Sequence, residues 1–163
     1  MISRFLKSLG YALKGIGYGI RNERNIRIDM VAMVFAASLG FIAKADRAEW
    51  TALVICMFLV PSLELVNTAI ERRVTRPDME HYDLAGIAKD TAAGAVLVAS
   101  IASLIVAGII FLEKEKLGRI IGFITGSPSG WMCLGGFILL SYVFVTMDRF
   151  NKEDKENRES KDK

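Results

Sequence analysis

Two carboxylates and an amide lie on one side of an otherwise apolar stretch of this sequence. Glu64, Asn67 and Glu71 are spaced i, i+3 and i+7, so they share one face of a helix. A carboxylate within an apolar span costs about 3 kcal/mol on membrane-insertion scales and is therefore a functional candidate. Glu64 is placed to act as a general base, and Glu71 to hold a divalent cation. The alternative is a polar stripe that only joins helices.

A second cluster of polar residues precedes the next apolar run. Lys89 and Asp90 stand where that run begins, and Glu80, His81 and Tyr82 lie in the loop before it. An ammonium group there can bind phosphate as a point charge, or it can simply extend to the membrane interface. The sequence contains neither a P-loop motif nor a kinase-type glycine-rich loop. The residues by themselves therefore predict only a site for a cation and an anion.

Four apolar segments must position these residues. The chain is 52% hydrophobic with a mean hydropathy of +0.34, and its charges stand in blocks between uncharged runs. A bilayer core of about 30 Å needs roughly 20 apolar residues per helix. The sequence thus predicts an all-α integral membrane bundle with four transmembrane helices. The expected spans are residues 28–43, 48–66, 92–112 and 130–147.

The segments outside these spans differ in character. Residues 1–21 carry apolar side chains at spacings of three and four, which predicts an amphipathic helix in the headgroup plane. Residues 113–129 are expected to form a loop, and the charged tail 150–163 to be disordered. The predicted organisation is a membrane domain over 1–112, a loop and additional span over 113–147, and a cytoplasmic tail over 148–163.

The basic residues predict the orientation. Of the 21 Lys and Arg, 16 fall in the N-terminal segment, the second loop and the tail, and the other two loops hold five. Because cytoplasmic loops carry the excess of Lys and Arg, both termini are expected in the cytoplasm. The expected location is the cell inner (cytoplasmic) membrane, with several passes.

Two motifs resemble those of the prokaryotic diacylglycerol kinase family, which includes undecaprenol kinases. The stretch ELVNTAIE at 64–71 matches the family signature, and AKD at 88–90 follows at the expected distance. The N-terminal helix is also similar, through RFLKSLGY at 4–11 and then Asn22 and Glu23. The resemblance extends over roughly residues 3–112.

The resemblance implies an ATP-dependent lipid kinase and a role for each matching residue. Glu64 would deprotonate the lipid hydroxyl with Asn67 beside it. Glu23 and Glu71 would hold Mg²⁺ that bridges the ATP phosphates. Lys89 would neutralise phosphate charge, with Asp90 adjacent. The remaining nucleotide contacts implied are Arg4, Tyr11, Glu80, His81 and Tyr82.

The resemblance also implies a homotrimer with sites shared between subunits. The acceptor would be undecaprenol or diacylglycerol, and the run 89–96 is more similar to the undecaprenol type. The sequence departs from the family pattern at Thr75, where an acidic residue is usual, and in its fourth span. That span carries no catalytic residue, so a peripheral packing role is expected. The alternatives are a small membrane transporter and a catalytically inactive scaffold.

Overall fold

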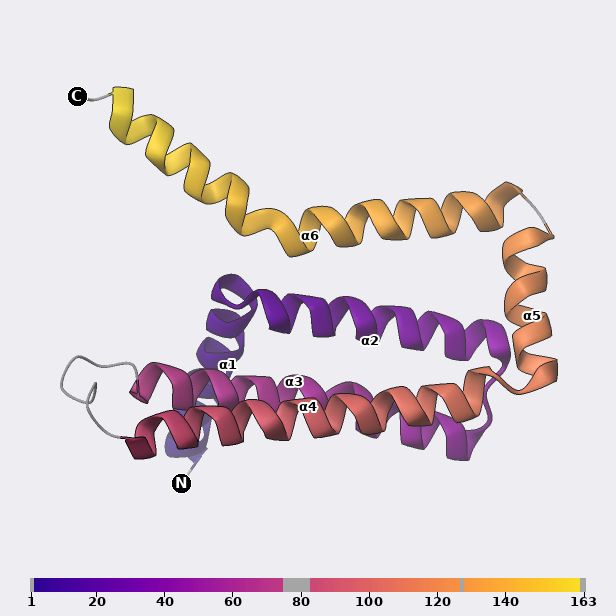
Figure 1. Cartoon of the computed structure of the whole chain (residues 1–163), viewed down its shortest axis with the longest axis horizontal. Helices are drawn as coiled ribbons and strands as arrows, with labels where there is room; N and C mark the ends of the chain where they lie inside the picture. Colours follow the sequence, from indigo (N-terminus) through magenta and orange to yellow (C-terminus); the bar gives the residue numbers. More distant parts are fainter. Residues whose placement is uncertain (1, 75–82, 127, 162–163) are drawn as a thin grey trace.

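The computed structural model describes residues 2–74, 83–126 and 128–161, and these are helical apart from short connections (Figure 1). No strand occurs within those ranges, which confirms the all-α prediction. The six helices, in chain order, are α1 (Ile2–Asn22), α2 (Arg24–Ala43), α3 (Arg47–Val74), α4 (Asp83–Phe111), α5 (Lys114–Thr125) and α6 (Pro128–Lys161).

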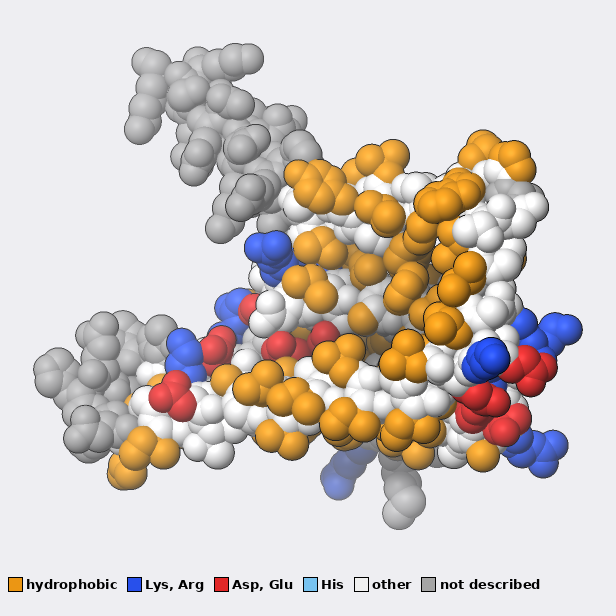
Figure 2. All heavy atoms as spheres, turned by 45° about the vertical axis from the view of Figure 1, so that its right-hand side comes forward, with side chains coloured by type: hydrophobic (Ala, Val, Ile, Leu, Met, Phe, Trp, Pro, Cys, Tyr) orange, Lys and Arg blue, Asp and Glu red, His pale blue; other side chains and the backbone are white. Residues whose placement is uncertain are grey.

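Four of these helices are long and apolar enough to cross a membrane. The candidate spans are Arg24–Ala43, Arg47–Val74, Leu84–Phe111 and Pro128–Met147. They confirm the predicted number of spans. In Figure 2, hydrophobic side chains cover the surface between two charged ends of the bundle, as a lipid-facing surface requires.

The helices α2, α3 and α4 run side by side, and each reverses the direction of the one before it (Figure 1). The helix α1 crosses one end of this group, and α5 crosses the other end and leads to α6. Antiparallel order places the start of α2, the end of α3 and the start of α4 at the same end. The polar residues identified in the sequence belong to these three segments.

A close contact forms the corner between α1 and α2. A Cβ atom at Gly19 would lie 2.6 Å from Ile26 Cδ1 and 2.7 Å from Leu65 Cδ2, so a larger residue would require these two side chains to shift. The buried Arg27 donates from Nη1 to the carbonyls of Ile20 and Arg21, each at 3.1 Å. These bonds satisfy carbonyls in the last turn of α1, which have no partner within that helix.

The expected loop over 113–129 is wrong, because most of it forms the helix α5. Leu117, Ile120, Ile121 and Ile124 recur at helical spacing, and this pattern was too short to stand out beside the long spans. Ile120 is buried in a small core formed with residues of α2, α3 and α4. The other buried members of that core are Ala43, Leu53, Ile110 and Phe111.

Two expected boundaries also change. The helix α4 begins at Asp83, so Lys89 and Asp90 lie within it rather than at the end of a loop. The sequence placed the start at the apolar run, but a helix can continue beyond the hydrocarbon into the interface. The helix α6 continues to Lys161 and includes most of the tail for which disorder was expected. Lys and Glu are good helix formers, so a helix can extend into such a sequence.

Candidate active site

The general-base candidate lies in the buried face of α3. Glu64 is 8% exposed and Asn67 is 9% exposed, and Thr68 is buried beside them. The stripe predicted from the i, i+3 spacing is therefore directed into the bundle. The side-chain oxygen Oδ1 of Asn67 is buried and has no hydrogen-bond partner among the described residues. A buried amide oxygen without a partner is costly and is expected where a ligand or water binds.

A carboxylate of α2 faces the same stripe. Asp29 is close enough to Glu64 for their like charges to interact, and its Oδ2 atom is buried without a hydrogen-bond partner in the described part of the chain. Two carboxylates at such a distance repel each other when both are ionised. A positive group bound near them would relieve this repulsion.

The first ion pair at this end connects the α1–α2 corner to α3. Arg72 Nη2 lies 2.7 Å from Glu23 Oε1, and the guanidinium stacks over the Tyr18 ring at 4.6 Å from its centroid. Glu23 is the N-cap residue of α2. The structure thus joins Glu23 to the signature helix through an arginine to which the sequence analysis assigned no function.

The second ion pair connects α3 to α4. Lys89 Nζ lies 3.5 Å from Glu71 Oε1, and both side chains are partly exposed. The prediction that the lysine and the carboxylate meet at one end of the bundle is consistent with this contact. Asp90 is exposed on the same turn of α4.

The two predicted metal ligands have the donor atoms that Mg²⁺ prefers. Mg²⁺ is commonly held by one or two carboxylates together with substrate phosphates and water. Arg72 is paired with Glu23, and the charge of Glu71 also acts on it. No group of three or more His, Cys, Asp and Glu side chains suited to a metal occurs among the described residues. Glu23 and Glu71 therefore fit a cation whose other ligands are phosphate oxygens and water.

The predicted nucleotide contacts divide into three groups. Lys89 and Asp90 lie near Glu71. Arg4 and Tyr11 are exposed on α1, where Lys14 Nζ lies 6.0 Å from the Tyr11 ring centroid. Among the described residues, no hydrogen bond or ion pair joins either of them to the two ion pairs. Glu80, His81 and Tyr82, together with Thr75, lie outside the described residues.

Comparison with known proteins assigns this arrangement to a family. A model of the prokaryotic diacylglycerol kinase family matches residues 10–111. The chain belongs to this family. The match includes Glu64, Asn67, Glu71 and Lys89, so the resemblance seen in the sequence motifs is confirmed. The chain is thus an enzyme, a lipid kinase, and the transporter alternative is excluded.

Named relatives agree with this assignment. An undecaprenol kinase of Bacillus subtilis is 39% identical over 69% of this chain and 92% of its own length. A diacylglycerol kinase of Synechocystis is 42% identical over 66% of this chain and 62% of its own length. The diacylglycerol kinase of Escherichia coli K12 is 34% identical over 63% of this chain and 84% of its own length. No solved structure matches the chain.

Two further residues of the candidate site, Asp29 and Arg72, can be related to features of the sequence. Asp29 is a carboxylate at the edge of an apolar run, which is the same signal that identified Glu64. Arg72 directly follows the signature glutamate, but a basic residue at the end of a membrane span is common for reasons of orientation alone. Only the folded chain shows that Arg72 contacts Glu23.

Proposed function

We propose that this kinase transfers the γ-phosphate of ATP to the hydroxyl of a membrane lipid at the end of the bundle that holds Glu64. The observation that carries the proposal is a buried carboxylate, Glu64, on the α3 face that also carries Glu71, at the end of the bundle where two carboxylate–cation pairs form. A kinase site needs a base for the acceptor, ligands for Mg²⁺ and cations for phosphate. In this proposal Glu64 is the base, Glu23 and Glu71 are the ligands for Mg²⁺, and Lys89 is the cation for phosphate.

In the proposed reaction, Glu64 accepts the proton of the lipid hydroxyl while that oxygen attacks the γ-phosphorus. The bond from the phosphorus to the bridging oxygen breaks, and ADP leaves. Asn67 positions the acceptor, since its Oδ1 atom is buried and has no hydrogen-bond partner among the described residues. Lys89 binds a phosphate oxygen after it leaves Glu71. When bound, Mg²⁺ on Glu23 and Glu71 would neutralise charge on the phosphates.

The position of Glu64 on α3 supports a lipid acceptor. Glu64 lies in the part of α3 that is apolar enough to span the membrane, whereas Glu71 and Lys89 lie nearer to the helix ends. The hydroxyl of a lipid can reach Glu64 from within the membrane. A soluble nucleotide can reach Glu71 and Lys89. The charge distribution supports the cytoplasm as the side from which ATP arrives.

The acceptor that we favour is undecaprenol. The run 89–96 on α4 resembles the undecaprenol type, and a relative that bears this name shares 39% identity over 92% of its length. Diacylglycerol is the alternative, since the other relatives named above are diacylglycerol kinases. We further propose a homotrimer in which neighbouring subunits share sites.

A direct assay of acceptors tests the proposed function. The purified chain in detergent receives ATP labelled in the γ-phosphate, Mg²⁺ and either undecaprenol or diacylglycerol. We expect labelled lipid with both and a kcat/KM at least about ten-fold higher with undecaprenol, which corresponds to about 1.4 kcal/mol of discrimination. Preference for diacylglycerol would reverse the assignment of the acceptor. No transfer to any lipid alcohol would support the inactive scaffold instead.

A further inference from the structure

The far end of the bundle from Glu64 contains an open cavity of about 480 Å³. It lies where α2 ends against α5, and its lining residues are Phe41, Ile42, Lys44, Arg119 and Phe123. Two of the five are cationic and none is acidic. Arg119 and Phe123 belong to α5, which lies beyond the part of the chain that matches the family. The cavity therefore depends on the C-terminal extension of this chain.

Lys44 occupies an unusual backbone position beside the cavity. Its φ and ψ angles are 56° and 51°, in the left-handed region where glycine is the usual residue at a helix C-terminus. The amide of Lys44 donates to the Phe41 carbonyl, and the amide of Ala45 donates to Gly40. The side chain of Lys44 is exposed and has no hydrogen bond or ion pair among the described residues. A strained lysine with an unused ammonium group suggests a functional reason for its presence.

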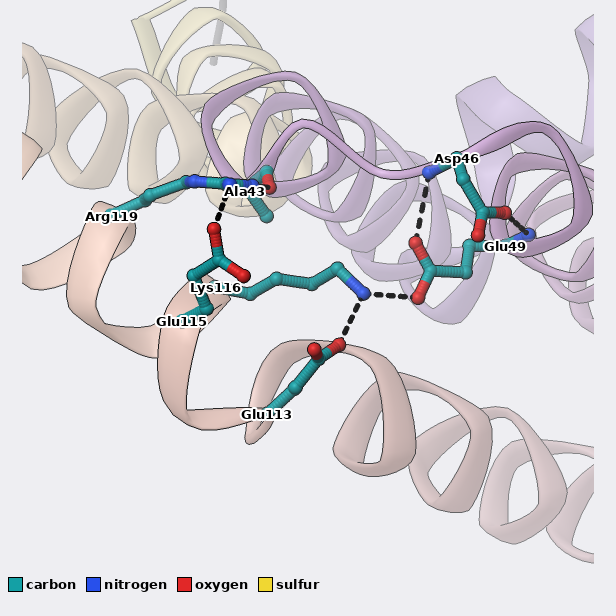
Figure 3. Close-up of polar contacts among 7 residues, drawn as sticks. All are labelled: Ala43, Asp46, Glu49, Glu113, Glu115, Lys116 and Arg119. Carbon is teal, nitrogen blue, oxygen red and sulfur yellow. Dashed lines mark hydrogen bonds and ion pairs between the residues drawn. The ribbon is translucent and has the colours of Figure 1, made fainter.

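Arg119 lines the same cavity as Lys44 and is fixed there by the backbone of α2. Its Nη1 donates to the Ala43 carbonyl at 2.8 Å, and its Nη2 donates to Glu115 Oε1 at 2.5 Å (Figure 3). A guanidinium carries five N–H groups, so these two bonds leave donors for a ligand. Glu115 is highly exposed and is the acidic side chain closest to this arginine in the sequence. It reduces the positive charge of the pair of cations but does not line the cavity.

The other three lining residues are apolar, and the two aromatic ones are exposed. Phe41 is 75% exposed, and Phe123 is also exposed. The Phe41 ring lies 4.8 Å from the Trp50 ring, and tryptophan favours the membrane interface. Because α2 and α3 are candidate spans whose ends meet here, we place the cavity at the level where lipid headgroups meet acyl chains. Two cations beside two aromatic side chains match the chemistry of an anionic phospholipid.

We infer that this cavity binds the headgroup phosphate of an anionic phospholipid, in the leaflet opposite the catalytic end. Lys44 and Arg119 bind the phosphate, and the acyl chains lie along Phe41 and Phe123. The inference does not rest on the proposed function, because none of these residues belongs to the catalytic site. Lipid bound there would hold α5 on the end of α2.

Fluorescence of a single tryptophan tests this site. The chain contains Trp50 and Trp131, so a Trp131→Phe background leaves only the indole next to Phe41. That protein is reconstituted in phosphatidylcholine with increasing amounts of phosphatidylglycerol whose acyl chains are brominated. Brominated phosphatidylcholine in the same amounts serves as the reference. We expect phosphatidylglycerol to be preferred at the Trp50 position by at least about five-fold, since one basic residue near an anionic lipid has roughly this effect.

Substitutions at Lys44 separate charge from folding. Lys44→Gly suits the left-handed backbone, so the protein should stay folded with unchanged kinase activity and lose the preference for phosphatidylglycerol. Lys44→Arg should keep the preference. Lys114→Gln, a change at an exposed lysine that does not line the cavity, should also keep it. Equal quenching by the two lipids in the parent protein would overturn the inference, as would an unchanged preference in Lys44→Gly.

Inorganic phosphate distinguishes the source of the phosphate group. Millimolar phosphate at constant ionic strength should leave the lipid preference unchanged, because free phosphate gains nothing from the apolar walls. Complete loss of the preference in phosphate would show a site for a free anion and would contradict a lipid site.

Discussion

At the scale of single residues, Arg72 is the side chain that joins the most parts of the proposed site. It bonds Glu23, stacks on Tyr18 and interacts with the charge of Glu71. Ion pairs that are partly exposed contribute little to stability, so a structural reason alone does not account for this set of contacts. We interpret Arg72 as a positioning residue that holds Glu23 until Mg-ATP binds.

The neighbouring arginine offers a matched control for this interpretation. Arg72→Gln should lower kcat/KM for ATP about ten-fold and raise the Mg²⁺ concentration needed for half-maximal rate, because Glu23 loses the partner that places it. Arg73→Gln, a change at an exposed side chain one position along, should leave both values unchanged. Equal effects of the two substitutions would indicate a general loss of positive charge rather than positioning of Glu23.

The residue pattern predicted part of this site for a physical reason. Carboxylates in apolar sequence are rare, so Glu64 and its i+3 and i+7 neighbours stood out without any structure. The basic partners did not stand out, because Lys and Arg at the ends of spans also serve orientation and interfacial contacts. The pairing of Glu23 with Arg72 depends on the corner between α1 and α2. No local sequence pattern specifies that corner.

At the scale of elements, α5 attaches the additional span to the family core. Lys116 is only 11% exposed and bonds both Glu49 at the start of α3 and Glu113 before α5 (Figure 3). Asp46 and Glu49 form a reciprocal capping box at the start of α3, with both bonds at 2.9 Å. One ammonium group thus joins α5 to a capped helix end, and Ile120 adds an apolar contact.

Removal of this ammonium group should loosen α5. Lys116→Met should lower the thermal unfolding temperature in detergent, because the carboxylates of Glu49 and Glu113 then lack their shared cation. Lys114→Met, at an exposed lysine on the same helix, serves as the control. The hydrogen bonds that Lys116 donates to Glu113 and, second, to Glu49 raise its pKa. Its contribution to stability should therefore be complete below the ordinary pKa of lysine, about 10.4, and be lost only as pH rises through the higher value.

The length of the apolar pattern explains why the four spans were predicted from the sequence and the helix α5 was not. The four spans were predictable because about 20 uncharged residues leave few alternatives in a lipid environment. The helix α5 has only 12 residues and shows its apolar stripe among five charged or polar positions, so it resembled a loop. The helix depends on packing against Ala43 of α2 and Phe111 of α4. A local sequence pattern contains no information about these contacts with other helices.

At the scale of the whole molecule, the polar chemistry divides between two ends of the bundle. One end holds Glu64 and the ion pairs of the proposed site, and the other holds α5, its contacts and the cavity beside Lys44. The apolar surface of Figure 2 separates them. A lipid bound at the proposed site beside Lys44 could therefore stabilise the bundle without contacting the proposed catalytic residues at the other end.

The proposed sharing of sites between subunits has its own test. Glu23→Gln and Glu71→Gln should each be inactive alone. If the two residues of one site come from neighbouring subunits, oligomers mixed from both variants should contain some intact sites and recover measurable activity. Failure of mixed oligomers to recover activity would mean that each chain builds a complete site by itself, which the proximity of both carboxylates to Arg72 within one chain would then explain.

The most direct measurement of the central claim is the transfer of labelled γ-phosphate to lipid by Glu64→Gln. The substitution keeps the shape of the side chain and removes its ability to accept a proton. A general base contributes about 10²- to 10⁴-fold, so transfer should fall at least about 100-fold while binding of ATP stays unchanged. Glu115→Gln, at an exposed glutamate on α5, should transfer phosphate at the rate of the parent protein. Retention of more than about a tenth of the parent rate by Glu64→Gln would contradict its assignment as the base.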